Sequence, residues 1–120
     1  MTFKSHELKL LMQYYIQTDE MCDNQELMVI HFWETLAELY NNDVGCQVRR
    51  TAQEVRTAYE NFTRACTRYT KIINEVISEN VFENTRSTYD GRYNLKYRTP
   101  FIGHDAYFIR QNWLERFGWP

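Results

Sequence analysis

The clearest pattern in the chain is a run of apolar residues at helical spacing between residues 51 and 78. It follows Thr51-Ala52-Gln53-Glu54, in which the threonine hydroxyl and the glutamate carboxylate can each accept a hydrogen bond from the other residue's backbone amide. The spacing predicts a long helix buried along one side. Its apolar positions are Val55, Ala58, Tyr59, Phe62, Ala65, Cys66, Tyr69, Ile72, Ile73 and Val76.

Two shorter helices are predicted before this run. The first has Ser5 as its N-cap residue and fades over residues 18–23. Asn24 can cap a second helix over residues 25–40, and the polar residues 41–45 then indicate a loop. Since Gly (4) and Pro (2) are also scarce, the prediction is a mainly α fold: a three-helix, helix-turn-helix-like bundle with a long third helix.

Residues after 78 follow a less regular pattern. Asp90-Gly91 lies between tyrosine-bearing flanks in Ser87–Tyr93, which favours a β-hairpin. Asp105 can cap a short last helix over residues 106–117. We therefore expect a helical domain over residues 1–78 and a C-terminal extension over residues 79–120 that packs on the long third helix.

The distribution of charge along the chain is uneven, although the formal net charge is only −2. Residues 1–48 carry a net −6 and residues 49–71 carry a net +4. The three cysteines, Cys22, Cys46 and Cys66, form no CxxC pair, so neither a disulfide framework nor a zinc site is expected. No secretory signal or membrane span is indicated, and an intracellular protein is expected.

The basic residues of the third helix lie on the side opposite its apolar stripe. A solvated face is one interpretation. The other is DNA binding, because a helix fits the major groove and its first turns reach base edges. Candidate base-reading residues are Arg50, Gln53, Arg56 and Thr57, with Arg49 just before them. Candidate phosphate contacts are Arg64, Arg68 and Lys71.

Residues 3–73 resemble the Myb/SANT-like domains of the zeste, MADF and trihelix kind. The similarity rests on Trp33-Glu34-Thr35-Leu36-Ala37, on Tyr40-Asn41, and on Arg50-Thr51 followed by Val55, Tyr59, Asn61 and Phe62. The resemblance implies a trihelical fold and binding of double-stranded DNA in a transcription or chromatin factor, hence a nuclear location.

The alternative is a non-catalytic protein-interaction module, since SANT-type members of that group also bind proteins. It would be an adaptor, a dimerisation module or a small viral or phage inhibitor protein. A basic partner could bind Glu26, Glu34 and Glu38, and the aromatic tail, with Tyr107 and Trp113, could form a protein interface. No catalytic motif, metal site, cofactor or small-molecule substrate is indicated, so the chain is expected not to be an enzyme.

Overall fold

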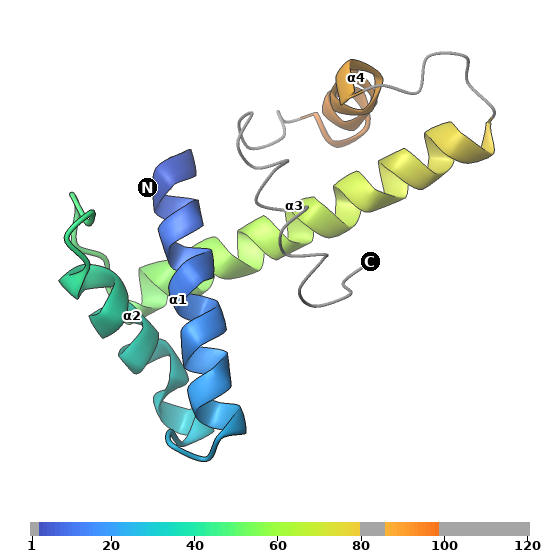
Figure 1. Cartoon of the computed structure of the whole chain (residues 1–120). Coiled ribbons are helices and arrows are strands. Elements are labelled where there is room, and N and C mark those ends of the chain that lie inside the picture. Colours follow the sequence, from blue (N-terminus) through green and yellow to red (C-terminus); the bar gives the residue numbers. More distant parts are fainter. Residues whose placement is uncertain (1–2, 80–85, 99–120) are drawn as a thin grey trace. The chain divides into compact units, whose positions relative to one another are not determined.

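The computed structural model describes residues 3–79 and 86–98, and this part of the chain is mainly helical (Figure 1). This confirms the mainly α fold class. The last helix predicted over residues 106–117 lies outside the described residues. The elements are α1 (Ser5–Asp23), the short 3₁₀ helix η1 (Val29–His31), α2 (Phe32–Asn42), α3 (Ala52–Ser78) and α4 (Arg86–Tyr97).

Helix α1 extends over the predicted range, but its N-cap is Lys4, one residue before the predicted cap. The Glu7 carboxylate accepts a hydrogen bond from the Lys4 backbone N–H at 3.1 Å. A carboxylate in the first turn also interacts favourably with the helix dipole. The apolar positions Leu8, Leu11 and Met12 are buried, as their spacing predicts.

Helix α2 begins later than the sequence pattern indicates. Gln25 has a positive φ of 61° and breaks the helix expected from Asn24. A single 3₁₀ turn follows, and α2 starts only at Phe32. Leu36, Ala37 and Tyr40 are then buried, and α2 packs against α1. The predicted helix over residues 25–40 is therefore wrong for residues 25–28, and residues 29–31 form a 3₁₀ turn in place of an α-helical one.

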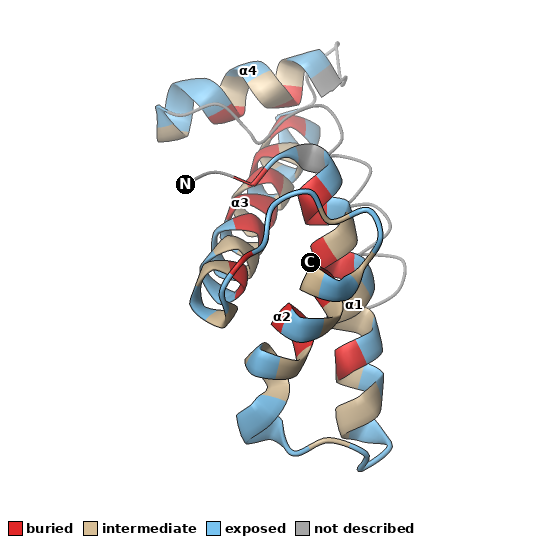
Figure 2. Ribbon diagram, turned by 90° about the vertical axis from the view of Figure 1, so that its left-hand side faces the viewer, coloured by how far each residue is buried: buried red, intermediate tan, exposed pale blue. Residues whose placement is uncertain are grey.

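Helix α3 is the element that the sequence predicts best. The N–H of Thr51 donates to Glu54 Oε1 and the N–H of Glu54 donates to Thr51 Oγ1, both at 3.1 Å, so the predicted cap is confirmed. Buried residues recur along the helix (Figure 2). They are Val55, Phe62, Ala65, Cys66, Tyr69, Ile72 and Val76.

Helix α4 occupies the residues where a β-hairpin was predicted. Tyr89 and Tyr93 lie one helical turn apart and are buried, with Tyr97 one turn further on beside them. They pack with Tyr69, Ile72 and Val76 in one apolar cluster. This packing outweighs the local turn preference of Asp90-Gly91, so the hairpin prediction is wrong for residues 87–93.

The chain divides into two compact units, Met1–Glu60 and Asn61–Pro120. The boundary lies inside α3, whereas the sequence pattern placed it after residue 78. In the first unit, Tyr59 stacks on Tyr15 with ring centroids 4.3 Å apart. In the second unit, the Tyr69 hydroxyl donates to Asp90 Oδ1 at 2.6 Å. The two parts of α3 thus contribute to different cores, which explains the position of the boundary.

Candidate nucleic-acid interface

The entry into α3 is fixed by the last turn of α2. The Asn41 side-chain amide donates to the backbone carbonyl of Arg50 at 2.7 Å, and the Arg50 N–H donates to Asn41 Oδ1 at 2.8 Å. Asp43 in the intervening loop accepts hydrogen bonds from the Tyr14 hydroxyl and the Gly45 N–H. These contacts tie Asp43 to α1 and the backbone of Arg50 to α2.

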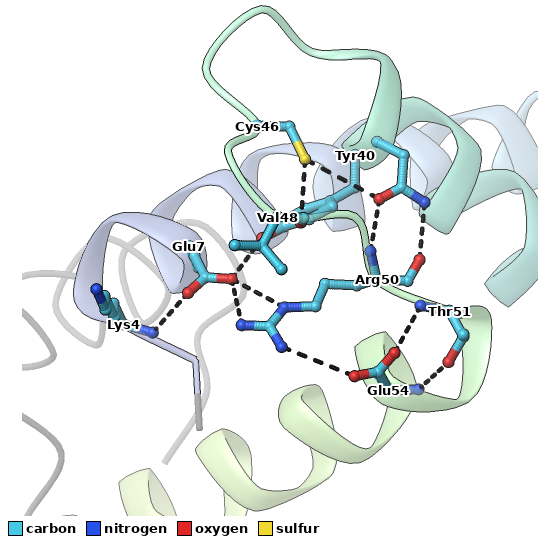
Figure 3. A network of polar contacts seen from close by, with 9 residues as sticks. Lys4, Glu7, Tyr40, Cys46, Val48, Arg50, Thr51 and Glu54 are labelled. Carbon is cyan, nitrogen blue, oxygen red and sulfur yellow. Dashed lines mark hydrogen bonds and ion pairs between the residues drawn. The ribbon is translucent and has the colours of Figure 1, made fainter. Parts of the chain in front are cut away.

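Arg50 is the arginine that points inward, and its side chain is only 4% exposed. Its Nε and Nη2 donate to Glu7 Oε2 at 2.9 and 2.7 Å (Figure 3). Its guanidinium lies 4.4 Å from the centroid of the Phe3 ring, and Nη1 is 3.7 Å from Glu54 Oε2. Arg50 therefore does not lie on an exposed basic face, contrary to its predicted role as a base reader.

The buried carboxylate of Glu7 is the centre of this network. It also accepts a hydrogen bond from the Tyr40 hydroxyl at 3.2 Å. Burial acts to raise the pKa of Glu7, but the hydrogen bonds from Arg50, the Lys4 backbone and Tyr40, together with the positive charge of Arg50, outweigh it, so the pKa is lowered. Burial and the Glu7 charge together raise the pKa of Tyr40. Glu7 and Arg50 thus form an ionised pair that joins the start of α1 to the start of α3.

The residues that do face solvent at the start of α3 are Arg49, Gln53, Arg56 and Thr57. Gln53 Nε2 donates to Thr57 Oγ1 at 3.2 Å. Arg56 Nε donates to Glu60 Oε1 at 3.1 Å, and its guanidinium lies 5.9 Å from the Trp33 ring centroid. Of the five predicted residues between 49 and 57, all except Arg50 are therefore exposed. Of the two exposed arginines, Arg56 is paired with the carboxylate of Glu60.

The three predicted phosphate contacts belong to the second unit. Arg64 and Lys71 are exposed on α3. Arg68 is half-buried, and its guanidinium lies 4.8 Å from the centroid of the Tyr97 ring. Arg68 also lowers the pKa of Tyr93, against the larger upward effect of burial. Arg68 is therefore engaged in packing α4, while Arg64 and Lys71 face solvent.

The acidic residues named for protein binding, Glu26, Glu34 and Glu38, are all exposed. Glu34 lies 3.8 Å from Nδ1 of His31. Tyr107 and Trp113 lie outside the described residues. The first unit carries five Lys or Arg against ten Asp or Glu, a net charge of −5, so carboxylates outnumber its basic residues.

The sequence pattern missed the role of Glu7. Its only local signal is its position three residues after the N-cap of α1, which is typical of a helix-capping carboxylate. Its partner Arg50 is 43 residues away, so no spacing rule connects them. Within residues 3–79 and 86–98, no three His, Cys, Asp or Glu side chains are grouped as metal ligands would be, and no helix is long and apolar enough to cross a membrane.

Acidification should weaken the first unit through Glu7. Because the Glu7 pKa is lower in the folded chain than the ordinary value of 4.5, the Glu7–Arg50 pair stabilises the fold above that value. This stabilisation is lost as the pH falls through the lowered pKa. Urea unfolding between pH 7 and pH values below 4.5 measures the loss. Glu7→Gln, which does not titrate, should be less stable at pH 7 and should show a shallower pH dependence.

Comparison with known proteins identifies no relative: no protein-family model, no curated protein and no solved structure matches the chain. The similarity of residues 3–73 to Myb/SANT-like domains therefore stays a prediction from the motif residues.

Proposed function

We propose that the chain is a non-catalytic DNA-binding module whose α3 enters the major groove with its first turns. The observation that carries the proposal is the exposure of Arg49, Gln53, Arg56 and Thr57, while Val55 and Tyr59 on the same turns pack inward. Arg pairs with guanine and Gln with adenine through two hydrogen bonds, so these side chains have base-reading chemistry. A nuclear role in transcription or chromatin is part of this proposal.

The burial of Arg50 reduces the set of DNA-contacting residues. The exposed cations that remain on or next to α3 are Arg49, Arg56, Arg64 and Lys71. On a duplex that lacks a recognised sequence, a cation lies against phosphate and not against a base, and each phosphate contact contributes about −0.9 to the slope of log affinity against log salt. Arg49 and Arg56, the two exposed cations of the first unit at this end of α3, would therefore contribute about −1.8. Since the first unit has a net charge of −5, we expect weak binding at physiological salt and much tighter binding at low salt.

Fluorescence anisotropy with a random-sequence duplex, titrated from low to physiological salt, tests the proposal. Arg49→Ala combined with Arg56→Ala should weaken binding and reduce the slope by about 1.8, the share of two phosphate contacts. Lys4→Ala combined with Lys9→Ala removes the same charge from exposed positions at the start of α1 and is the matched control. No binding at low salt, or equal loss in both double variants, would contradict the proposed surface.

Glu60→Gln provides a variant that should gain affinity. It removes a carboxylate from an exposed position of α3 and releases Arg56 from its ion pair. Binding should become several-fold tighter in the same anisotropy measurement. Because Glu60 is exposed, the thermal stability should change little, which separates this gain from an effect on folding.

A further inference from the structure

Three successive apolar side chains face solvent in the connection between α1 and α2. Met28, Val29 and Ile30 are 65%, 76% and 76% exposed. They lie in and just before the single 3₁₀ turn η1, which contains no buried residue. Scattered apolar residues are normal on a protein surface, but adjacent ones that form a patch indicate a site of interaction.

Carboxylates surround this apolar segment in the sequence. No Lys or Arg occurs between Lys9 and Arg49, while seven Asp or Glu do. Asp23, Glu26 and Glu34, all exposed, lie within a few residues of the segment. The pKa of Asp19 is raised by burial and by the charges of Asp23 and Glu20, as expected where like charges are crowded. We call Met28–Ile30 with Asp23, Glu26 and Glu34 the acidic-apolar surface.

The charge of this surface restricts what can cover it. Phosphates of DNA and the anionic headgroups of a membrane would be repelled by its carboxylates. A basic tail without apolar residues would leave Met28, Val29 and Ile30 in water. The occupant that satisfies both features has apolar side chains along one side and Lys or Arg beside them, as an amphipathic cationic helix does.

We propose that the acidic-apolar surface docks a cationic amphipathic segment of a partner protein. Its apolar side chains would cover Met28, Val29 and Ile30, and its cations would lie near Asp23, Glu26 and Glu34. This docking uses none of the residues assigned to DNA, so it is independent of the proposed function. The apolar contact would provide the affinity, and the carboxylates would select a basic partner.

The probe is a labelled synthetic helix of about four turns with Leu on one face and Lys on the other. Its binding to the full chain is measured by anisotropy. The triple variant Met28→Ser, Val29→Ser, Ile30→Ser should weaken binding at least about tenfold, as loss of central apolar contacts does. Glu26→Gln combined with Glu34→Gln should weaken binding at low salt and reduce its salt dependence. Because all five side chains are exposed, the variants should keep the fold.

The matched control is Val44→Ser combined with Leu95→Ser, which removes exposed apolar side chains from other elements. It should bind the probe as the original chain does. Absence of binding, or equal affinity of the control and the triple variant, would overturn the proposal. So would equal binding of a probe with Glu in place of Lys. Concentration-dependent self-association that the triple variant abolishes would identify the occupant as a second copy and would also overturn it.

Discussion

Replacing Arg50 with alanine should destabilise the chain by about 3–5 kcal/mol, the usual cost of removing one partner of a buried ion pair. The variant leaves the Glu7 carboxylate buried without the guanidinium that donates to it through both Nε and Nη2. It also removes the cation–π contact between the guanidinium and the Phe3 ring. Since small proteins are stable by about 5–15 kcal/mol, much of the molecule's stability would be lost.

Arg49→Ala is the matched control, because the adjacent arginine is exposed and its loss should change stability by no more than about 0.5 kcal/mol. Urea unfolding followed by far-UV circular dichroism measures both free energies of unfolding. A double-mutant cycle with Glu7→Ala should give a double variant less destabilised than the sum of the single ones, because the two side chains interact directly. Equal stability of the two arginine variants would contradict the buried pair.

The difference between the buried Arg50 and the exposed Arg49 affects how DNA-binding data are interpreted. Arg50 precedes the helix with the basic face, so it is an obvious residue to mutate. Loss of DNA binding in Arg50→Ala would follow from unfolding of the first unit and would give no information about base contacts. The exposed pair Arg49 and Arg56 tests the interface without this complication.

Tyr93→Ala should destabilise the second unit by about 3–5 kcal/mol, as truncation of large buried aromatic residues does. Tyr93 is 3% exposed and packs against the rings of Tyr69 and Tyr97 at centroid distances of 6.1 and 4.8 Å. Without it, α4 would lose the central side chain of its buried face. The variant should therefore unfold at lower urea concentration and become susceptible to trypsin at Arg92 and Lys96.

Leu95→Ala provides the control on the same helix. Leu95 is 82% exposed, so its truncation removes little buried apolar surface. Its urea midpoint and its rate of tryptic cleavage should stay close to those of the original chain. If Tyr93→Ala and Leu95→Ala behaved alike, the packing of α4 through its tyrosines would be refuted.

Local signals were sufficient to predict α3 but not its neighbours. The Thr51–Glu54 cap and the long apolar stripe lie within one segment, so spacing rules describe them completely. The start of α2 depends on the positive φ of Gln25, which no spacing rule requires. Helix α4 depends on the apolar side of α3, so a local Asp-Gly turn signal is overruled by contacts with residues about 20 positions earlier.

In the candidate site, too, local spacing predicts some features, while others depend on residues far away in the sequence. Exposure of Gln53, Arg56 and Thr57 follows from the helical pattern, because they lie opposite the buried Val55 and Phe62. The burial of Arg50 does not follow from the helical pattern. A charged side chain is seldom buried without a partner, and the partner here, Glu7, comes close to Arg50 only in the folded chain. The exposure of Met28–Ile30 does not follow from the sequence either, because these residues fit the helical pattern predicted over residues 25–40.

The position of the unit boundary inside α3 determines how the chain can be divided. Domains are usually separated by cutting an exposed linker, but here the two units share one helical backbone from Ala52 to Ser78. A fragment ending at Glu60 would leave the last four carbonyl groups of the shortened helix without their intrahelical donors. A fragment beginning at Asn61 would leave the first four backbone N–H groups of its helix without intrahelical acceptors, and it would lack the Thr51 cap. Gene fusion or truncation at this boundary would therefore break a continuous ladder of hydrogen bonds, and each half would need a new helix end of its own.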